Sequence, residues 1–281
     1  MRRYRQLDLA VEALKNAAEQ EDSEAYHSAY DSLLAFVCTD VAKKKFFGAT
    51  PPEHHEFLTP TPVSELASFY AFVASASESY AQVFQDLFAL WHLQSKRQGT
   101  FVEVGAGDGV NLSNTYLLEK EYAWKGLLVE PNPQFHTQIE TSRSAALDRR
   151  CVTGTTGETV TLNCTDKPEF SRIERSAPDI HDEAGTRNII SQIEQTSVCL
   201  EDLLTAYGLA NTPIDYVSID IEGLELEVVS SFDLKKHGVA VATIEHNFTD
   251  AEAGLDAEMA RQGYRRVLKA ASRFDAWYVA D

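Results

Sequence analysis

Short apolar runs follow one another along the chain from Thr100 onward, and helical or loop stretches separate them. The first four runs are Phe101–Val104, Gly126–Val129, Tyr216–Ile219 and Val239–Ile244. Alternation of this kind predicts a parallel sheet that helices cover on both faces. Two later runs predict a closing antiparallel hairpin: Tyr264–Leu268 and Ala276–Val279.

The first hundred residues show helical spacing of their apolar positions instead. Between residues 43 and 62 the chain is punctuated by Pro51, Pro52, Pro60 and Pro62. Proline disrupts helix interiors, so this stretch predicts a linker or an extended arm. One long helix is expected from Pro62 to Trp91, with an aromatic stripe that packs against the next domain. We expect residues 1–77 to form a helical extension with this linker, and residues 78–281 to form the α/β domain.

Charge narrows the range of partners. The 281 residues hold 25 Lys and Arg against 43 Asp and Glu, a net charge of −18. We expect no binding to nucleic acid or to an anionic membrane, because both are polyanions. The chain shows no apolar stretch of about 20 residues and no signal-peptide pattern. Its four cysteines are isolated, which fits reduced thiols, and we therefore expect a cytoplasmic protein.

A glycine-rich turn follows the first strand and reads Gly105-Ala106-Gly107-Asp108-Gly109. Ligands of open parallel sheets bind beyond the carboxyl ends of the strands. A dinucleotide loop has its third glycine where this chain has Val110, and a pyrophosphate is repelled by Glu103. S-adenosylmethionine carries an amino group and a sulfonium, and therefore suits this acid better. An oxidoreductase that uses NAD(P) remains the alternative.

Acidic side chains also follow other predicted strands. Glu130-Pro131 ends the second strand, and Glu130 has the spacing from the glycine turn at which an acid binds ribose hydroxyls. Asp220 and Glu222 follow the run Tyr216–Ile219 and share one face of an extended backbone. Such a pair is typical of a base, a metal site or a substrate site. Glu225 fits equally well a structural acid at a helix start and a site residue.

The triplet Glu245-His246-Asn247 directly follows another apolar run. Histidine is the commonest general base, and His246 is the best placed of the eight histidines. A rival metal-like cluster, His54-His55-Glu56, lies in the proline-rich stretch, and we interpret it as a solvated turn.

In this order, the pieces resemble the FkbM-type methyltransferases, a family of S-adenosylmethionine-dependent O-methyltransferases. Besides the turns above, the matching segments are Tyr80–Asp86, Ser113–Thr115, Trp124–Pro131, Ser218–Glu225 and Asp275–Tyr278. The resemblance covers about residues 78–281. It implies a Rossmann-like class I methyltransferase fold with a seven-stranded sheet whose last strand is antiparallel. The chain departs from the family at Phe84-Gln85-Asp86, where members tend to have a glycine before the helix acid.

The resemblance also implies roles for individual residues. The implied cofactor-binding positions are Glu103, Gly105, Ala106, Gly107, Asp108, Asn114, Glu130, Pro131 and Asp220. The implied catalytic residues are His246, Asp220 and Glu222, and the substrate residues are Gln85, Glu245 and Asn247.

We expect in-line methyl transfer to a hydroxyl of a small molecule or glycan, with His246 or Asp220 taking the proton. Asp220 and Glu245 are candidate ligands for Mg²⁺ or Mn²⁺, and the third ligand is either Glu222 or His246. A non-catalytic binding module on the same scaffold is a further alternative. The N-terminal helices are candidates for a lid, a homo-oligomer surface or a substrate adaptor.

Overall fold

The computed structural model describes residues 63–176 and 187–281, together with scattered positions between 9 and 32. The proline-rich stretch and the cluster His54-His55-Glu56 lie outside the described residues.

The described cysteines are free thiols: Cys151 and Cys164 are buried, and Cys199 is half-buried. Cys38 lies outside the described part of the chain. No described helix is both long and apolar enough to cross a membrane. The cellular compartment stays a prediction.

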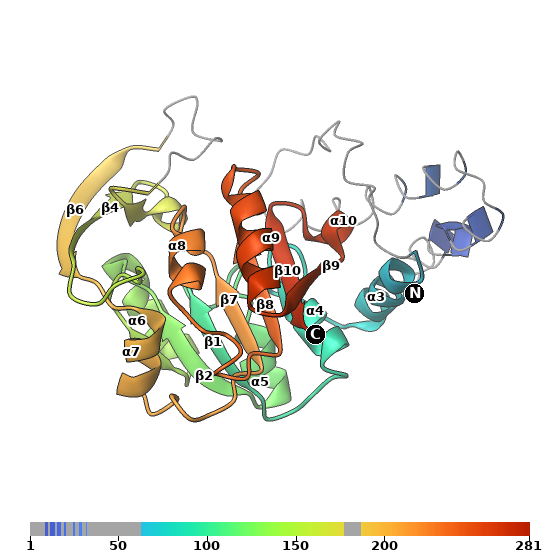
Figure 1. The fold of residues 1–281 in the computed structure, drawn as a ribbon, viewed down its shortest axis with the longest axis horizontal. Helices are drawn as coiled ribbons and strands as arrows, with labels where there is room; N and C mark the ends of the chain where they lie inside the picture. The colour runs from blue at the N-terminus through green and yellow to red at the C-terminus, as the bar shows by residue number, and fades with distance from the viewer. Residues whose placement is uncertain are drawn as a thin grey trace.

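Seven strands form the main sheet, in the order β3-β2-β1-β7-β8-β10-β9 (Figure 1). Their bounds are β1 Thr100–Val104, β2 Lys125–Val129, β3 Ala146–Asp148, β7 Tyr216–Ile219, β8 Val241–Glu245, β9 Tyr264–Val267 and β10 Asp275–Ala280. Neighbouring strands pair in parallel except β10, which is antiparallel to both β8 and β9. The parallel sheet and the closing antiparallel hairpin predicted from the apolar runs are confirmed, and so is the Rossmann-like, seven-stranded sheet that the resemblance implies.

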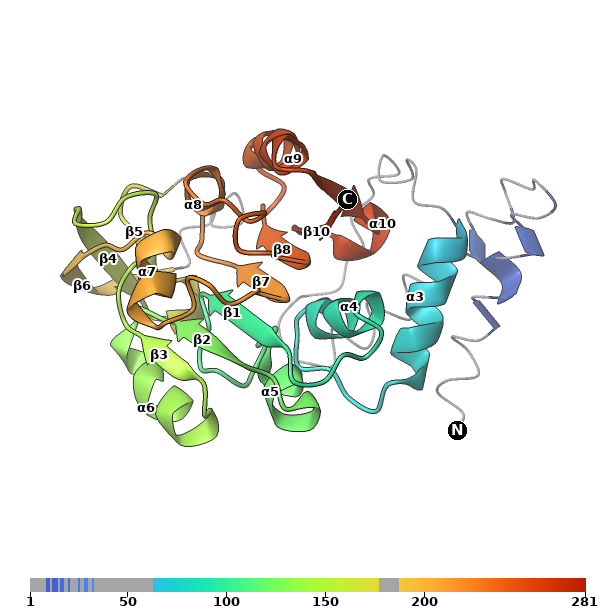
Figure 2. The same cartoon turned by 60° about the horizontal axis from the view of Figure 1, so that its bottom comes forward.

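Helices cover the sheet on both faces (Figure 2). One face carries α4 Gln85–His92, α5 Tyr116–Tyr122 and α6 Pro133–Ser142, and the other carries α7 Leu200–Ala206, α8 Glu225–Ser230 and α9 Ala251–Arg261. Strand residues alternate between the two resulting cores, because successive side chains of a strand point to opposite faces. Phe101 of β1 packs with the α4 side, and Val102 packs with the α7 side. Both sides of the sheet are therefore dry, as the continuous apolar runs require.

A second, three-stranded sheet lies beside the main one and was not predicted (Figure 1). Its order is β5-β4-β6, with β4 Thr159–Thr165, β5 Arg172–Ile173 and β6 Ile189–Thr196; a 3-10 turn, Pro168–Phe170, lies between β4 and β5. The β6 residues are mostly exposed and include several polar side chains. Such a strand has no buried face, so its sequence lacks the alternation that marks a strand.

The single long helix expected from Pro62 to Trp91 is wrong, because two helices occupy this stretch. The first is α3 Val63–Ser75, and α4 begins at Gln85. Between them, the buried carboxylate of Asp86 accepts hydrogen bonds from the Ser79 hydroxyl at 2.6 Å and the Tyr80 N–H at 2.8 Å. These bonds stabilise a turn in place of a continuous helix. The turn ends at Phe84, whose φ of +72° is a conformation that glycine adopts more readily.

Aromatic rings join α3 to the sheet. The Phe69 ring lies 5.4 Å from the ring of Trp277 on β10, measured between centroids, and Phe88 of α4 stacks on the same tryptophan at 4.5 Å. Phe69 and Trp277 are fully buried. The aromatic stripe thus packs against the sheet domain, as its spacing predicted. The domain boundary at residue 77 stays a prediction.

We expect Phe69→Ala to lower the free energy of unfolding by about 3–5 kcal/mol, because it leaves a cavity beside Trp277. Urea unfolding followed by tryptophan fluorescence measures this change. Ile190→Ala is the control, since Ile190 is 58% exposed, and its effect should stay within about 0.5 kcal/mol. Equal effects of the two substitutions would show that α3 contributes nothing to the core.

Candidate active site at the carboxyl edge of the sheet

The glycine turn after β1 lies directly against the segment that follows β7. The N–H groups of Gly105 and Ala106 donate to the Val129 carbonyl at 2.9 and 3.1 Å, which ties the turn to β2. Gly105 has a φ of +85°, and a Cβ built on it lies 1.7 Å from the Asp220 carbonyl oxygen. Only glycine fits this contact, so the turn and Asp220 are held together. A Cβ on Gly107 meets nothing within 4 Å, so the turn is open on that side.

Glu130 ends β2 beneath the turn. One carboxylate oxygen accepts the Gly107 N–H and the other accepts the Asn132 N–H, both at 2.8 Å. Burial raises the pKa of Glu130 to about 8, although these two hydrogen bonds oppose the shift. Each oxygen keeps a second lone pair, so the carboxylate can still accept from two hydroxyls of a diol. The next residue, Pro131, faces the small sheet through its carbonyl, which accepts from the Gln195 side chain at 3.2 Å.

Glu103 lies inside the protein with partners of its own. Its carboxylate accepts from the Asn114 N–H at 2.6 Å, from the Ser113 hydroxyl at 3.1 Å and from the Thr115 hydroxyl. The guanidinium of Arg143 lies 3.7 Å away. Burial raises the pKa of Glu103, and the charge of Arg143 is the largest influence that lowers it. Arg143 therefore balances the negative charge of Glu103, which the sequence analysis assigned to the binding of a cationic cofactor. The cofactor role of Glu103 stays a prediction.

The sequence analysis did not identify Arg143, which is fully buried at the end of α6. Its side chain donates to the Gly109 carbonyl at 2.9 Å and pairs with Glu119 at 2.9 Å. It also donates to the Thr115 hydroxyl at 2.8 Å. One arginine thus holds both ends of the segment between the glycine turn and α5. Because its partners are distant in sequence, no local pattern reveals this role.

Two other predicted cofactor residues lie along the same segment. Asp108 accepts the Val110 and Asn111 N–H groups at 2.8 and 2.7 Å, which is a turn-forming arrangement. Asn114 donates its side-chain N–H to the Ser218 hydroxyl at 2.8 Å. Its side-chain oxygen is buried and has no hydrogen-bond partner in the described part of the chain. A buried unpaired oxygen of this kind is costly and is a candidate ligand-binding atom.

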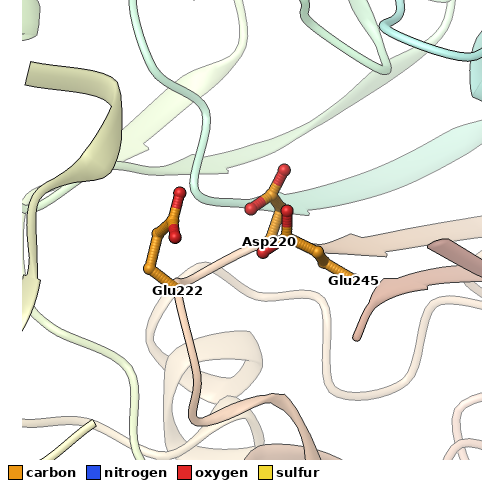
Figure 3. A group of neighbouring side chains, drawn as sticks. All are labelled: Asp220, Glu222 and Glu245. Atoms are coloured by element: carbon orange, nitrogen blue, oxygen red, sulfur yellow. The ribbon is translucent and has the colours of Figure 1, made fainter. Parts of the chain in front are cut away.

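Three carboxylates converge next to the turn: Asp220 and Glu222 follow β7, and Glu245 ends β8 (Figure 3). One oxygen from each lies within 4.8 Å of those of the other two. Glu222 has a φ of +61°, a conformation that is strained for a side-chain-bearing residue.

Asp220 and Glu245 also share a hydrogen bond between their side chains. Burial raises the pKa of both groups, and the charges of Asp220 and Glu222 raise that of Glu245 further, well above its ordinary value. The shared bond raises the pKa of Glu245 and lowers that of Asp220, so Glu245 is the donor and Asp220 the acceptor. The pair offers one carboxylate that can accept a further proton.

Glu225 has a structural role that is visible in its hydrogen bonds. Its carboxylate accepts the N–H groups of Ile221 and Gly223, both at 3.0 Å. Burial raises its pKa to about 7, and these backbone bonds oppose the shift. Glu225 thereby fixes the turn that carries Glu222.

His246 directly follows Glu245 in the sequence, but both of its ring nitrogens have partners. Nδ1 accepts the Phe248 N–H at 3.1 Å, and Nε2 lies 3.2 Å from the Asp275 carbonyl, to which it can donate. Burial lowers the pKa of His246 to about 4, and the nearby charge of Arg266 lowers it further. The next residue, Asn247, donates its N–H to the Phe274 carbonyl at 3.0 Å. Catalytic use of His246 and substrate binding by Asn247 stay predictions.

Gln85 and Asp275 connect α4 to this edge of the sheet. The Gln85 side chain donates to the Asp275 carboxylate at 2.8 Å, and Asp275 is the register partner of Glu245. Burial raises the pKa of Asp275 to about 7. The sequence analysis did not single out Asp275, although a signal existed. An antiparallel strand begins at the edge where parallel strands end, so an acid before the last apolar run belongs to the same edge.

Comparison with protein-family models gives a match over residues 103–266 to the family described as "Methyltransferase FkbM domain". The match begins at Glu103 of β1 and ends at Arg266 of β9, and therefore spans the glycine turn and all three converging carboxylates. No curated protein matches the chain.

We expect Gly105→Ala to destabilise the protein by about 1–3 kcal/mol more than Gly157→Ala, because its methyl group overlaps the Asp220 carbonyl. Gly157 is a matched control: its φ is +92°, and its Cβ meets nothing within 4 Å. The control therefore carries only the cost of a positive φ, about 1–2 kcal/mol. Urea unfolding of the two variants measures the difference, and equal losses would contradict the close approach.

Proposed function

Because the chain belongs to the FkbM methyltransferase family, we propose that it transfers a methyl group from S-adenosylmethionine to a hydroxyl of a small molecule or glycan. The single observation that supports this best is the group of acids beside the glycine turn. Asp220 and Glu245 are held there without a lysine or arginine partner among the described residues. This environment favours a cationic ligand and opposes a phosphate.

The residues around the turn fit S-adenosylmethionine. Glu130 retains lone pairs for both ribose hydroxyls, and the open side at Gly107 leaves space for a ligand to approach the backbone. The unpaired oxygen of Asn114 can accept from an amino group. When bound, S-adenosylmethionine supplies an electrophilic methyl group on a sulfonium. A pyrophosphate bound at the same turn has to lie beside the acids Glu130 and Asp220, which repel it. This repulsion argues against NAD(P) as the cofactor.

We assign the proton-accepting role to Asp220, one of the two residues that the sequence analysis offered. Asp220 is half-buried, whereas His246 is 3% exposed and its Nδ1 lone pair already accepts a backbone N–H. Glu245 orients the Asp220 carboxylate through their shared hydrogen bond. Holding the acceptor oxygen in line with the methyl group supplies most of the acceleration, and a positioned base adds about 10²–10⁴-fold.

The acids also limit the acceptor chemistry. Carboxylates accept hydrogen bonds from hydroxyls, and they repel carboxylate or phosphate groups. Neutral, hydroxyl-rich acceptors such as sugars or polyhydroxylated natural products fit this edge of the sheet best. Glu222 and Gln85 are the proposed acceptor-side residues.

Calorimetric titration with S-adenosylhomocysteine and with NAD tests the cofactor. We expect the first to bind and the second not to, and Glu130→Gln should weaken S-adenosylhomocysteine binding about tenfold, because one of the two oxygens that can accept from the ribose hydroxyls becomes an amide donor. Glu140→Gln is the control, since Glu140 lies on the exposed side of α6 and pairs with Arg149. Binding of NAD alone favours the oxidoreductase alternative and overturns the proposal.

Methyl-labelled S-adenosylmethionine tests the acceptor. We expect label to enter neutral sugars or polyhydroxylated natural products in a panel that also holds amines and carboxylic acids. Asp220→Asn should lower the rate about 10²–10⁴-fold, because the proton acceptor is lost. Glu194→Gln, on the exposed β6, should leave it unchanged. Label in amines only, or cofactor binding without any transfer to the panel, contradicts O-methylation and favours a binding module.

A further inference from the structure

We propose that Asp220, Glu222 and Glu245 form a binding site for one hard divalent cation of the Mg²⁺, Mn²⁺ and Ca²⁺ class. Their carboxylates come from two different chain segments; Figure 3 shows Asp220 and Glu245 close together and Glu222 beside them. The site is additional to methyl transfer, since a cation can bind there whether or not S-adenosylmethionine does.

Asp220 and Glu245 differ from those acids of the protein whose charge a basic side chain balances. Arg143 lies beside Glu103 and Glu119, and Arg266 and Lys269 pair with Glu252. In the part of the chain that the structure describes, Asp220 and Glu245 have no such partner. Burying acids this close together without a cation is costly. The positive charge that they need can therefore come from a bound ion.

Glu245 gives a second, independent indication of a ligand. Its side chain is 8% exposed, and its Oε2 atom has no hydrogen-bond partner in the described part of the chain. Most buried polar atoms are paired, so an unpaired carboxylate oxygen at the meeting point of three acids has an unfilled binding capacity.

The spacing of the oxygens agrees with such an ion. Ligand atoms on opposite sides of a cation stand two bond lengths apart, about 4.1 Å for Mg²⁺ and about 4.6–5.2 Å for Ca²⁺. The three carboxylate oxygens lie within 4.8 Å of one another, so an ion between them reaches all three. Three protein ligands leave about three positions of an octahedral ion for water or for two hydroxyls of a diol.

The ligand set selects the class of ion. All three donors are carboxylate oxygens, which favour hard cations over Zn²⁺ or Cu²⁺. The alternative set of metal ligands, in which His246 replaces Glu222, is less favourable. The Nδ1 atom of His246 accepts the Phe248 N–H, and its Nε2 atom faces the Asp275 carbonyl.

Binding of Mn²⁺ to the full chain, freed of metal with EDTA and without added cofactor, tests the site. The electron paramagnetic resonance signal of free Mn²⁺ falls as the ion binds. We expect one Mn²⁺ per chain, displaced by Mg²⁺ or Ca²⁺. Glu222→Gln and Glu245→Gln should each weaken binding about tenfold or more, since each loses a charged ligand. Glu194→Gln, with the same change of charge on the exposed β6, should bind as the wild type does.

Two further measurements make the result decisive. In the absence of metal, Glu245→Gln should melt close to the wild-type temperature, because the glutamine amide can donate to Asp220 as Glu245 does. Unchanged melting shows that weaker metal binding is not caused by misfolding. The proposal is overturned if the wild-type protein shows no saturable Mn²⁺ binding up to about 10 mM, a concentration above the dissociation constants of the weakest protein calcium sites. Equal Mn²⁺ binding by all variants overturns it too. S-adenosylhomocysteine binding to the metal-free protein separates the two proposals, because it tests the cofactor alone.

Discussion

The contact between the Gly105 backbone and the Asp220 carbonyl determines the geometry of the whole carboxyl edge. It leaves no room for a side chain, and it brings the turn after β1 against the end of β7. Because Gly105 and Ala106 also bond to the end of β2, three strand ends are fixed relative to one another. Glu130 and Asp220 therefore lie close to each other, and Glu245 reaches Asp220 through the pairing of β8 with β7. The chemistry of this edge depends on backbone packing before it depends on any side chain.

Buried acids in this protein fall into two groups with different consequences. Glu103 and Glu119 share Arg143, and this network holds the segment between the glycine turn and α5. Its charges cancel within the protein, so it stabilises the fold and has little charge left for a ligand. Asp220 and Glu245 are not balanced in this way, and burial raises the pKa of both. The first group prepares the binding surface, and the second group supplies its charge.

The sequence was informative where burial imposes a pattern. β1, β2, β7 and β8 are continuous apolar runs because both of their faces are covered, and the acids that follow them could be placed at one edge. β6 could not be predicted, because an exposed strand needs no apolar face. The break between α3 and α4 depends on Asp86, whose carboxylate binds backbone N–H groups that a helix otherwise uses. Arg143 acts through partners that are distant in sequence, and no spacing rule reports such contacts. The depth of His246 in the protein likewise follows from tertiary packing rather than from its neighbours in sequence.

The position of β10 has a consequence for the order in which the protein folds. β9 precedes β10 in the chain, yet its strand partner in the described sheet is β10 alone. β9 therefore cannot join the sheet before β10 lies against β8. Only the short helix α10, Lys269–Ser272, separates the two strands, so their pairing is local and closes at a low entropic cost. The hairpin can form first and then dock as a unit on the open edge of β8, which protects that edge from pairing with other chains. Asp275 lies on this hairpin, so it reaches the acidic edge of the sheet only when the hairpin docks on β8.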